Sequence, residues 1–398
     1  MLPFQQVAEI LTQVVYQATG KTILTPQNTG EFVNVATTLL TYGVDPVIKA
    51  LSTVMGRTIF SIRPYDRKFR MMEASADRWG FHTRTITFTE SNIEDNDTYK
   101  YPALWDDTKD PASGDGESVD QWVIKKERAV QTNFYGGNVF GDHISIFTEP
   151  FEIVFRNPAE FSQFLGTMML NWKNKREQYL ENIARALLIN GVAAIIDEND
   201  PDRVVHLLTE YNTFTGQSLT PQTVYQADNF KSFVAWAYSK IDQIAGLMSE
   251  RSELYQTKLD NNYIVRHTPS REQVFYRYVQ SSTMIDTMIL PGTFNPQYLR
   301  TIPSERVNFW QSIRTPSAIN TTPKYMDTDG SIKTGNPVLS ENVFGILCDR
   351  EFMGYSIIKN KLKTTTENAR AEYYNIYWHT LVKAWLDNTE KAVVFCLD

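Results

Sequence analysis

The chain of 398 residues exceeds the ~250 to 300 residues at which a single hydrophobic core stops growing, so we expect more than one domain. Hydrophobic residues make up 42% of the chain and charged residues 21%, which excludes a wholly disordered chain and a fibrous repeat. The net charge of -7 argues against non-specific binding to the phosphates of nucleic acids.

The aromatic content is high and the cysteine content is low. Phe, Trp and Tyr make up 13% of the residues, which favours heavily packed cores or large contacts with other proteins. Two cysteines, Cys348 and Cys396, are too few for a disulfide framework or a cysteine-rich zinc site, and they suit a reducing cytoplasm. The first residues, MLPFQQVAEILTQVV, lack the features of a signal peptide, and no apolar run reaches ~18 residues. We therefore expect a soluble chain that is not exported.

The N-terminal third changes its pattern once. Apolar residues at helical spacing predict short helices over residues 5–18 and 46–55, separated by the turn-rich segment GKTILTPQNTGEF. Residues 57–73 then cluster apolar and basic side chains, and residues 81–89 alternate. We predict that these two segments are extended strands, joined by a loop over residues 74–80 into a long hairpin.

An acidic segment separates this hairpin from the next strands. Residues 90–120 are rich in Asp, Glu and turn residues and show no periodicity, which predicts a surface loop. Residues 122–155 return to strand-like runs.

The longest helical pattern follows. Asn157 is a suitable N-cap, and Pro158 suits the first helical position. A stripe of apolar residues continues past a polar middle at residues 173–178 and stops at an Asn-Gly pair, which predicts a helix over residues 158–190. At 1.5 Å per residue this helix would be roughly 50 Å long, which exceeds the diameter of a small domain.

The rest of the chain mixes both periods. The segment DENDPDR (197–203) predicts a turn, and residues 204–225 predict irregular strand and loop. Residues 228–250 repeat apolar side chains at helical spacing, which predicts a second helix. Mixed strand and short helix precede Pro- and Asn-rich loops over residues 291–340. The tail from residue 343 predicts a strand, a turn, a second strand, an aromatic segment and a last strand, AVVFCLD.

No pattern of a catalytic or cofactor site occurs in the sequence. Nucleotide-binding, hydrolase and metalloprotease motifs are missing, and the five histidines are too scattered for a zinc site. Asp327, Asp329 and Gly330 resemble the first half of a calcium loop, but the remaining oxygen ligands are missing, so a plain turn is favoured. We expect no catalytic residue, no cofactor and no metal.

Positive charge concentrates in the predicted hairpin. We assign five of its residues as candidate inter-subunit contacts: Arg57, Arg63, Arg67, Lys68 and Arg70. Charge complementarity of this kind sets register and partner choice when a basic arm docks on an acidic neighbour. A solvated ribbon without a partner is the alternative, and a nucleic-acid contact is the third interpretation.

Two blocks carry a family resemblance. They are the segment NFYGGNVFGDHISIFTEPFEIVFRNPAEFSQFLGTMMLNWKNKREQYLENIARALLING and the ending GILCDREFMGYSIIKNKLKTTTENARAEYYNIYWHTLVKAWLDNTEKAVVFCLD. With the order of parts between them, the chain resembles the major capsid proteins of tailed bacteriophages, which have the Hong Kong 97 capsid fold. It looks most similar to those of the short-tailed, phi-twenty-nine-like phages, without their immunoglobulin-like C-terminal module.

The resemblance implies an α+β fold with five parts. These are an N-terminal arm (1–56), an extended β-hairpin loop (57–100), a peripheral domain (101–205) with the spine helix 158–190, an axial domain (206–340) and returning C-terminal strands (341–398). The extended loop would reach over a neighbouring subunit. The polar middle of the spine helix would likewise face a neighbouring subunit rather than water.

The resemblance also implies function and partners. Hundreds of copies, as hexamers and pentamers, would form the icosahedral head around double-stranded DNA, without enzymatic activity or a membrane. Portal, scaffolding and head-decoration proteins would be further partners, and the protein would reside in the virion after assembly in the host bacterial cytoplasm. Some relatives join subunits by a Lys–Asn bond, and Lys68 is the lysine in the loop, but no partner is assigned to it.

Three other interpretations stay open. An encapsulin-like nanocompartment shell would have the same fold but would enclose cargo proteins instead of DNA. A cytoplasmic enzyme without a recognisable motif would belong to a different functional class. A tail or connector protein would form rings rather than closed shells.

Overall fold

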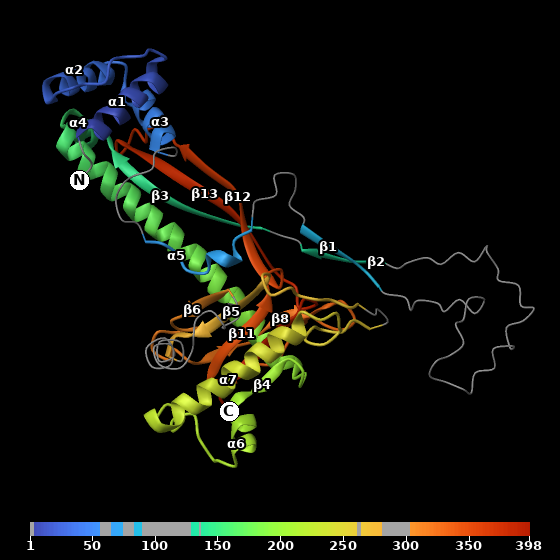
Figure 1. Ribbon diagram of the computed structural model, residues 1–398. Coiled ribbons are helices and arrows are strands. Elements are labelled where there is room, and N and C mark those ends of the chain that lie inside the picture. The colour runs from blue at the N-terminus through green and yellow to red at the C-terminus, as the bar shows by residue number, and fades with distance from the viewer. Residues whose placement is uncertain are drawn as a thin grey trace, which may run out of the picture.

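The subunit is built around one long helix that joins its two ends (Figure 1). This helix, α5 (Pro158–Glu198), has 41 residues. The computed structural model describes residues 4–55, 65–74, 83–89, 129–134, 137–260, 264–280 and 303–398. By length and composition α5 also meets the criterion for a membrane-spanning helix, but most of its apolar window is buried inside the subunit, which is the environment of a core helix.

A helical cluster surrounds the N-terminal half of α5. Its members are α1 (Phe4–Thr19), α2 (Thr29–Leu40), α3 (Val44–Met55) and α4 (Thr148–Arg156). Phe155 and Phe161 meet edge to face in the centre of this cluster, at 5.0 Å between ring centroids. The cluster therefore forms an upper core of its own.

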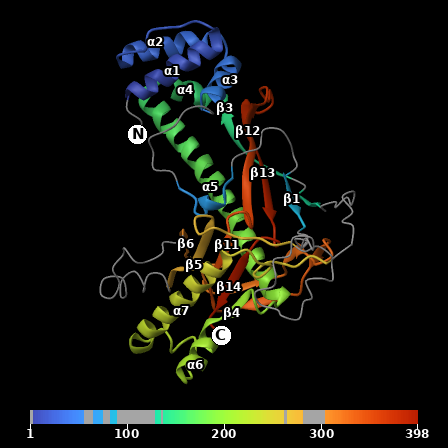
Figure 2. The ribbon, with the colours of Figure 1, turned by 45° about the vertical axis from the view of Figure 1, so that its right-hand side comes forward.

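A three-stranded antiparallel sheet runs beside the same half of α5. Its strands, in the order β12-β13-β3, are β12 (Met353–Thr364), β13 (Tyr373–Leu386) and β3 (Asn138–Phe147). Alternate residues of β13 enter the upper core, and Trp378 stacks on Trp172 of α5 at 5.1 Å. The other face of the sheet points away from α5 (Figure 2).

A five-stranded mixed sheet forms the lower end. Its order is β4 (Val204–His206), β14 (Ala392–Cys396), β11 (Val343–Asp349), β5 (Gln273–Tyr278) and β6 (Ser304–Val307). The C-terminal half of α5 packs on one face, and α6 (Leu207–Thr215) and α7 (Ala227–Met248) cover the other. Every residue of the central strand β11 is buried, as expected for a strand with a helix layer on each side.

Short elements complete the lower end and the middle. They are the 3-10 turn η1 (Arg70–Met72), the antiparallel pair β7 (Ile319–Thr321) and β10 (Val338–Ser340), and the hairpin β8 (Lys324–Met326) and β9 (Ile332–Thr334). The Asp327 to Gly330 segment is the turn of this hairpin: the Gly330 N–H donates to the Asp327 carbonyl at 2.9 Å, and Gly330 has φ +83°.

Several predicted elements are confirmed. Helices α1 and α3 cover residues 5–18 and 46–55, and α7 covers most of residues 228–250. The tail holds the predicted strands, and its aromatic segment is the 14-residue strand β13. Helix α2 was not predicted as an element, although Asn28 caps it by accepting the Glu31 N–H at 2.9 Å.

The predicted end of the long helix was wrong by eight residues. The Asn190 side chain makes two hydrogen bonds of 2.8 Å to the backbone of Lys324, and Gly191 lies so close to Phe352 that a Cβ there would be 3.0 Å from the ring. Both residues serve packing rather than termination. The helix ends before Asn199, whose φ of 51° is left-handed.

Residues 148–155 were predicted as strand but lie in helix α4. Phe151 and Phe155 are four residues apart, which places both on one helical face, and their rings lie 5.4 Å apart. The strand prediction followed the apolar run and missed this spacing.

The predicted hairpin has a different partner in the described residues. Strand β1 (Thr83–Phe88) pairs with β2 (Ala129–Phe134), on the far side of the acidic segment, rather than with residues 65–74. Residues 65–74 form η1 and an isolated bridge from Glu73 to Tyr355. The predictions for residues 57–64, 75–82 and 90–128 lie outside the described residues.

We expect Leu165→Asp to abolish the folded subunit, because Leu165 is fully buried in the upper core and a carboxylate there would have no partner. The free energy of unfolding should fall by about 4 kcal/mol or more. Gln163→Asp, on the exposed side of the same helix, is the matched control. Equal thermal unfolding curves for the two variants, followed by circular dichroism, would contradict this packing.

Candidate inter-subunit contact region

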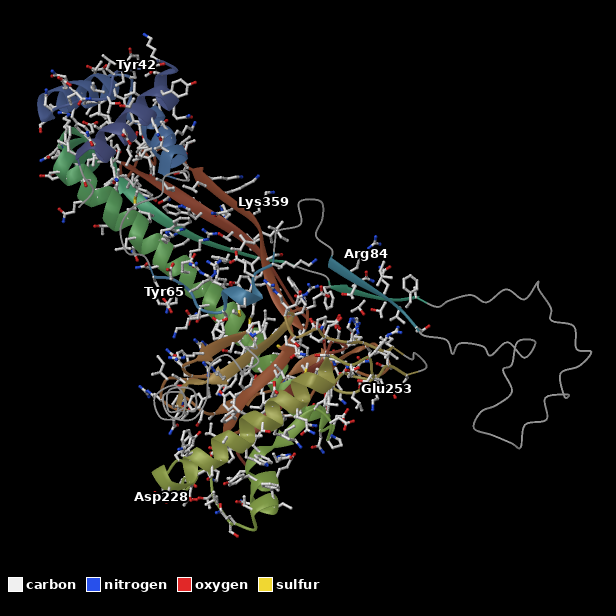
Figure 3. All side chains as sticks on the ribbon, in the orientation of Figure 1. Tyr42, Tyr65, Arg84, Asp228, Glu253 and Lys359 are labelled. Carbon is white, nitrogen blue, oxygen red and sulfur yellow. The ribbon has the colours of Figure 1, made fainter. Side chains whose placement is uncertain are left out.

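Three of the five predicted contact residues lie in the described segment 65–74, which crosses the middle of α5 (Figure 3). They are Arg67, Lys68 and Arg70. Arg57 and Arg63 lie outside the described residues. The segment runs between the upper and lower cores, and Phe69 and Met72 enter the lower one.

Arg67 is bound inside the subunit. Its guanidinium forms ion pairs with Glu177 of α5 and with Glu73, and its Nε donates to the Tyr355 hydroxyl at 2.9 Å. Only 8% of the Arg67 side chain is exposed. Burial alone would lower the pKa of Arg67, but the bonds to Glu177 and Tyr355 outweigh it and raise the pKa. Arg67 is thus a charged internal tie between the segment, α5 and β12.

A second tie lies one turn further along α5. The Tyr65 hydroxyl donates to Glu181 at 2.5 Å, Arg185 donates to the same carboxylate at 2.8 Å, and so does the Lys68 N–H at 3.2 Å. Burial would raise the pKa of Glu181, but the hydrogen bonds from Tyr65 and Arg185 lower it overall. The hydrogen bond to Glu181, with burial, raises the pKa of Tyr65 to about 12. Glu181 is therefore an ionised acceptor with three donors.

Phe69 connects the segment to the lower sheet. It has a left-handed φ of 61°, its ring is buried, and its N–H donates to Glu305 of β6. The Arg185 guanidinium lies over the rings of Phe69 and Phe309, at 5.1 and 3.7 Å from their centroids. Burial raises the pKa of Glu305. The strained backbone of Phe69 is held by contacts on both sides.

The polar middle of α5 has partners within the subunit, and the expectation that it also faces a neighbour stays a prediction. Asn174 accepts the Tyr65 N–H at 2.8 Å, Lys175 pairs with Asp142 of β3 at 2.9 Å, and Glu177 binds Arg67. These residues are polar because they lie between two apolar cores and hold a crossing segment. Sequence reasoning missed Glu177, Glu181 and Arg185 as a group, although their spacing of four places them on one helical face.

Lys68 and Arg70 differ from Arg67 in exposure. Arg70 pairs with Asp66 at 2.8 Å, but both side chains are more than half exposed, and the Lys68 side chain is partly exposed. Such a pair contributes little to stability in water. The inter-subunit role of Lys68 and Arg70 stays a prediction.

The β1–β2 ribbon projects sideways from the subunit (Figure 1). Arg266 holds its base: one guanidinium nitrogen donates to the hydroxyls of Thr87 in β1 and Thr389, at 3.1 and 3.0 Å, and the other binds Glu390. Nothing in the sequence around Arg266 indicated this contact. The ribbon is therefore tied to the turn between β13 and β14.

No protein-family model and no curated protein matches the chain. Among solved structures, the capsid structure of Staphylococcus phage Andhra matches with a TM-score of 0.51 at 9% identity, over 86% of this chain and 87% of that one. A chain in the structure of the head fiber and inner core protein gp22 of native bacteriophage P68 matches with a TM-score of 0.52 at 10% identity, over the same shares. The chain has a phage capsid fold. The α+β class is confirmed by this likeness and by the mixed elements of the subunit.

We expect Arg67→Ala to lower the free energy of unfolding by about 3 kcal/mol, because two carboxylates would lose their buried partner. Arg70→Ala is the matched control, since it removes an exposed pair and should cost about 0.5 kcal/mol or less. Urea unfolding of both variants measures the difference. If Arg67→Ala lowers the free energy of unfolding no more than Arg70→Ala does, the buried ion pairs of Arg67 are not needed for stability.

Proposed function

We propose that the protein is the major capsid protein of a tailed double-stranded DNA bacteriophage and assembles into its icosahedral head. The observation that carries this proposal is the fold, which matches the Andhra capsid structure across nearly the whole of both chains. Identity is only 9%, so the role rests on the architecture and not on particular residues.

The shape of the subunit supports a role in a wall. Two separate cores lie at opposite ends of α5, and the β1–β2 ribbon projects to one side between them (Figure 1). A two-stranded ribbon is marginally stable alone. Its outward face exposes Ile86 and Phe88, at 48% and 60%. Burying such a face needs another surface, and a second subunit provides one.

The finer assignments follow the resemblance to the Hong Kong 97 fold and to the phi-twenty-nine-like group. The N-terminal arm (1–56) would hold α1 to α3, the extended loop (57–100) would hold β1, and the peripheral domain (101–205) would hold β2, β3, α4 and α5. The axial domain (206–340) would hold α6, α7, β5 and β6, and the returning C-terminal strands (341–398) would be β11 to β14. Hexamers and pentamers would form the shell, with portal, scaffolding or decoration proteins as partners and DNA enclosed without sequence-specific contacts. The mature protein would reside in the virion after assembly in the host cytoplasm and would have no enzymatic role.

Expression of the protein, alone and with its neighbouring virion genes, tests this function. We expect closed particles in negative stain, and particles filled with DNA when the virion genes are present. A chain that stays a 45.8 kDa monomer under all conditions would contradict the proposal and favour an enzyme. Closed particles that contain enzyme cargo and no DNA would indicate a nanocompartment shell. Ring-shaped assemblies would indicate a tail or connector protein.

We also expect Lys68→Glu together with Arg70→Glu to leave the subunit folded and to block closure of the shell. Arg70 is exposed and Lys68 is partly exposed, whereas Arg67 is buried against two carboxylates. Circular dichroism measures whether the variant is folded, and electron microscopy shows whether closed particles form. The Lys68→Arg and Arg70→Lys pair, which keeps both charges, is the control. Normal particles from the glutamate variant would show that Lys68 and Arg70 are not needed for contacts between subunits.

A further inference from the structure

The turn between β13 and β14 is polar in sequence and buried in the fold. None of its five residues is more than 6% exposed: Asp387, Asn388, Thr389, Glu390 and Lys391. Asp, Glu and Lys are rarely buried to this degree unless they are paired. The partners of this turn, which we call the 387–391 turn, therefore determine what it does.

The first partner is the connection between α7 and β5 (residues 249–272, described except at 261–263). The Lys391 ammonium donates to the Glu250 carbonyl and to the Ser252 hydroxyl, both at 2.9 Å. Lys391 is fully buried, so these bonds replace its contacts with water. The connection is thereby attached to the turn at its first residues.

Arg266 attaches the same connection a second time and adds strand β1. One nitrogen of its guanidinium binds Glu390, and the other donates to the hydroxyls of Thr389 and Thr87, at 3.0 and 3.1 Å. Its side chain is only 15% exposed. Arg266 thus joins three parts of the chain that are far apart in the sequence: the 387–391 turn, the α7–β5 connection and β1.

The charged groups around Glu390 come from the turn and from the segments packed against it. They are Asp387 and Lys391 of the turn, Asp349 of β11, Glu351 just after β11, and Arg266 of the connection. Asp349 and Asp387 are shielded from water, as Glu390 is, and one guanidinium is paired with Glu390. The Lys391 ammonium is directed to Glu250 and Ser252 instead. A proton on one carboxyl would therefore reduce an excess of buried negative charge.

Hydrogen bonds separate the two aspartates from Glu390. Asp349 accepts the Thr268 hydroxyl at 2.7 Å and the Glu351 N–H at 2.8 Å. Asp387 accepts the N–H and the hydroxyl of Thr389, at 3.1 and 2.6 Å. Donors of this kind favour an ionised carboxylate. The proton is therefore expected on Glu390.

The acid–base properties of Glu390 agree with this geometry. Burial raises the pKa of Glu390 from its ordinary 4.5 to about 8, and Arg266 opposes this shift without outweighing it. A carboxyl with a raised pKa stabilises the fold at low pH, and this stability is lost as the pH rises from about 4.5 to about 8. Burial lowers the pKa of Lys391 from 10.5 to about 8, so its stabilising effect is lost as the pH falls from 10.5 to about 8. Below pH 8 the titration of Glu390 therefore dominates.

We propose that the 387–391 turn is a proton-dependent clasp, which holds the α7–β5 connection and β1 while Glu390 carries a proton and loosens when Glu390 loses it. In the step itself the O–H bond of the Glu390 carboxyl breaks and the proton passes to water. The added buried charge then repels Asp349 and Asp387. All of these groups belong to one subunit, so the clasp does not depend on the proposed function.

Hydrogen exchange, followed by mass spectrometry on the full chain, tests the clasp. Peptides covering residues 250–260, 264–268 and 83–88 are measured from pH 6 to pH 8, and each rate is expressed relative to the intrinsic rate at that pH. We expect the protection of these peptides to fall about tenfold or more over this range, while α1 in the upper core keeps its protection.

A variant of Glu390 assigns the effect. Glu390→Gln keeps an acceptor for Arg266 but has no proton to lose, so its protection should not change between pH 6 and pH 8. Glu351→Gln removes an exposed carboxyl beside the same site and is the matched control, which should keep the fall. No fall in the unaltered protein, or an equal fall in Glu390→Gln, would overturn the proposal.

A second measurement covers the case in which Glu390→Gln does not fold. A protonated carboxyl has the C=O absorption of a carboxylic acid, which infrared spectroscopy separates from that of a carboxylate. We expect the unaltered protein to show such a band at pH 6 and to lose it with a midpoint near pH 8. Absence of a band with this titration would overturn the clasp and would leave the proposed function unaffected.

Discussion

The subunit depends on how the middle of α5 is covered. The helix is too long to lie in one core, and its two ends are buried in separate apolar clusters. Between them its inward side is polar, and segment 65–74 closes over it through Arg67–Glu177 and Tyr65–Glu181. Buried charges are costly unless every one has partners, and Glu181 has three donors here. The network thereby fixes where segment 65–74 crosses α5 and holds the two cores at opposite ends of this helix.

The start of α5 could be predicted and its end could not, for a physical reason. Asn157 and Pro158 act through bonds and dihedral angles within one turn, so the sequence contains the whole cause. Gly191 continues the helix because Phe352, far away in the sequence, lies against it. A glycine at a close contact and a glycine at a helix end look the same in a single sequence. The same limit explains the hairpin, because alternation predicts that residues 83–88 form a strand but not that β2 is its partner.

The basic cluster shows what composition can and cannot predict about a site. Charge density drew attention to residues 57–84, and the described part of that region does hold the ties that cross α5. Arg67 and Arg70 are three residues apart and chemically alike, yet one is buried against two carboxylates and the other is in water. Only the fold separates them. The lysines of β12 were not singled out from the sequence, because their alternation indicates a face only once the strand and its inward Leu362 are known.

Charge therefore has two separate roles in this chain. The ties around Glu177 and Glu181 lie out of solvent, where salt screens weakly, so they stabilise the subunit before and after it meets others. The exposed lysines of β12 lie outside the cores, where attraction to an opposite charge is long-ranged at low salt and weak at high salt. A protein whose buried pairs hold the fold while its exposed charges guide contact can change its assembly with ionic conditions without unfolding. That separation suits the proposed shell function, since the subunits of a shell must stay folded while contacts between them form, break and form again.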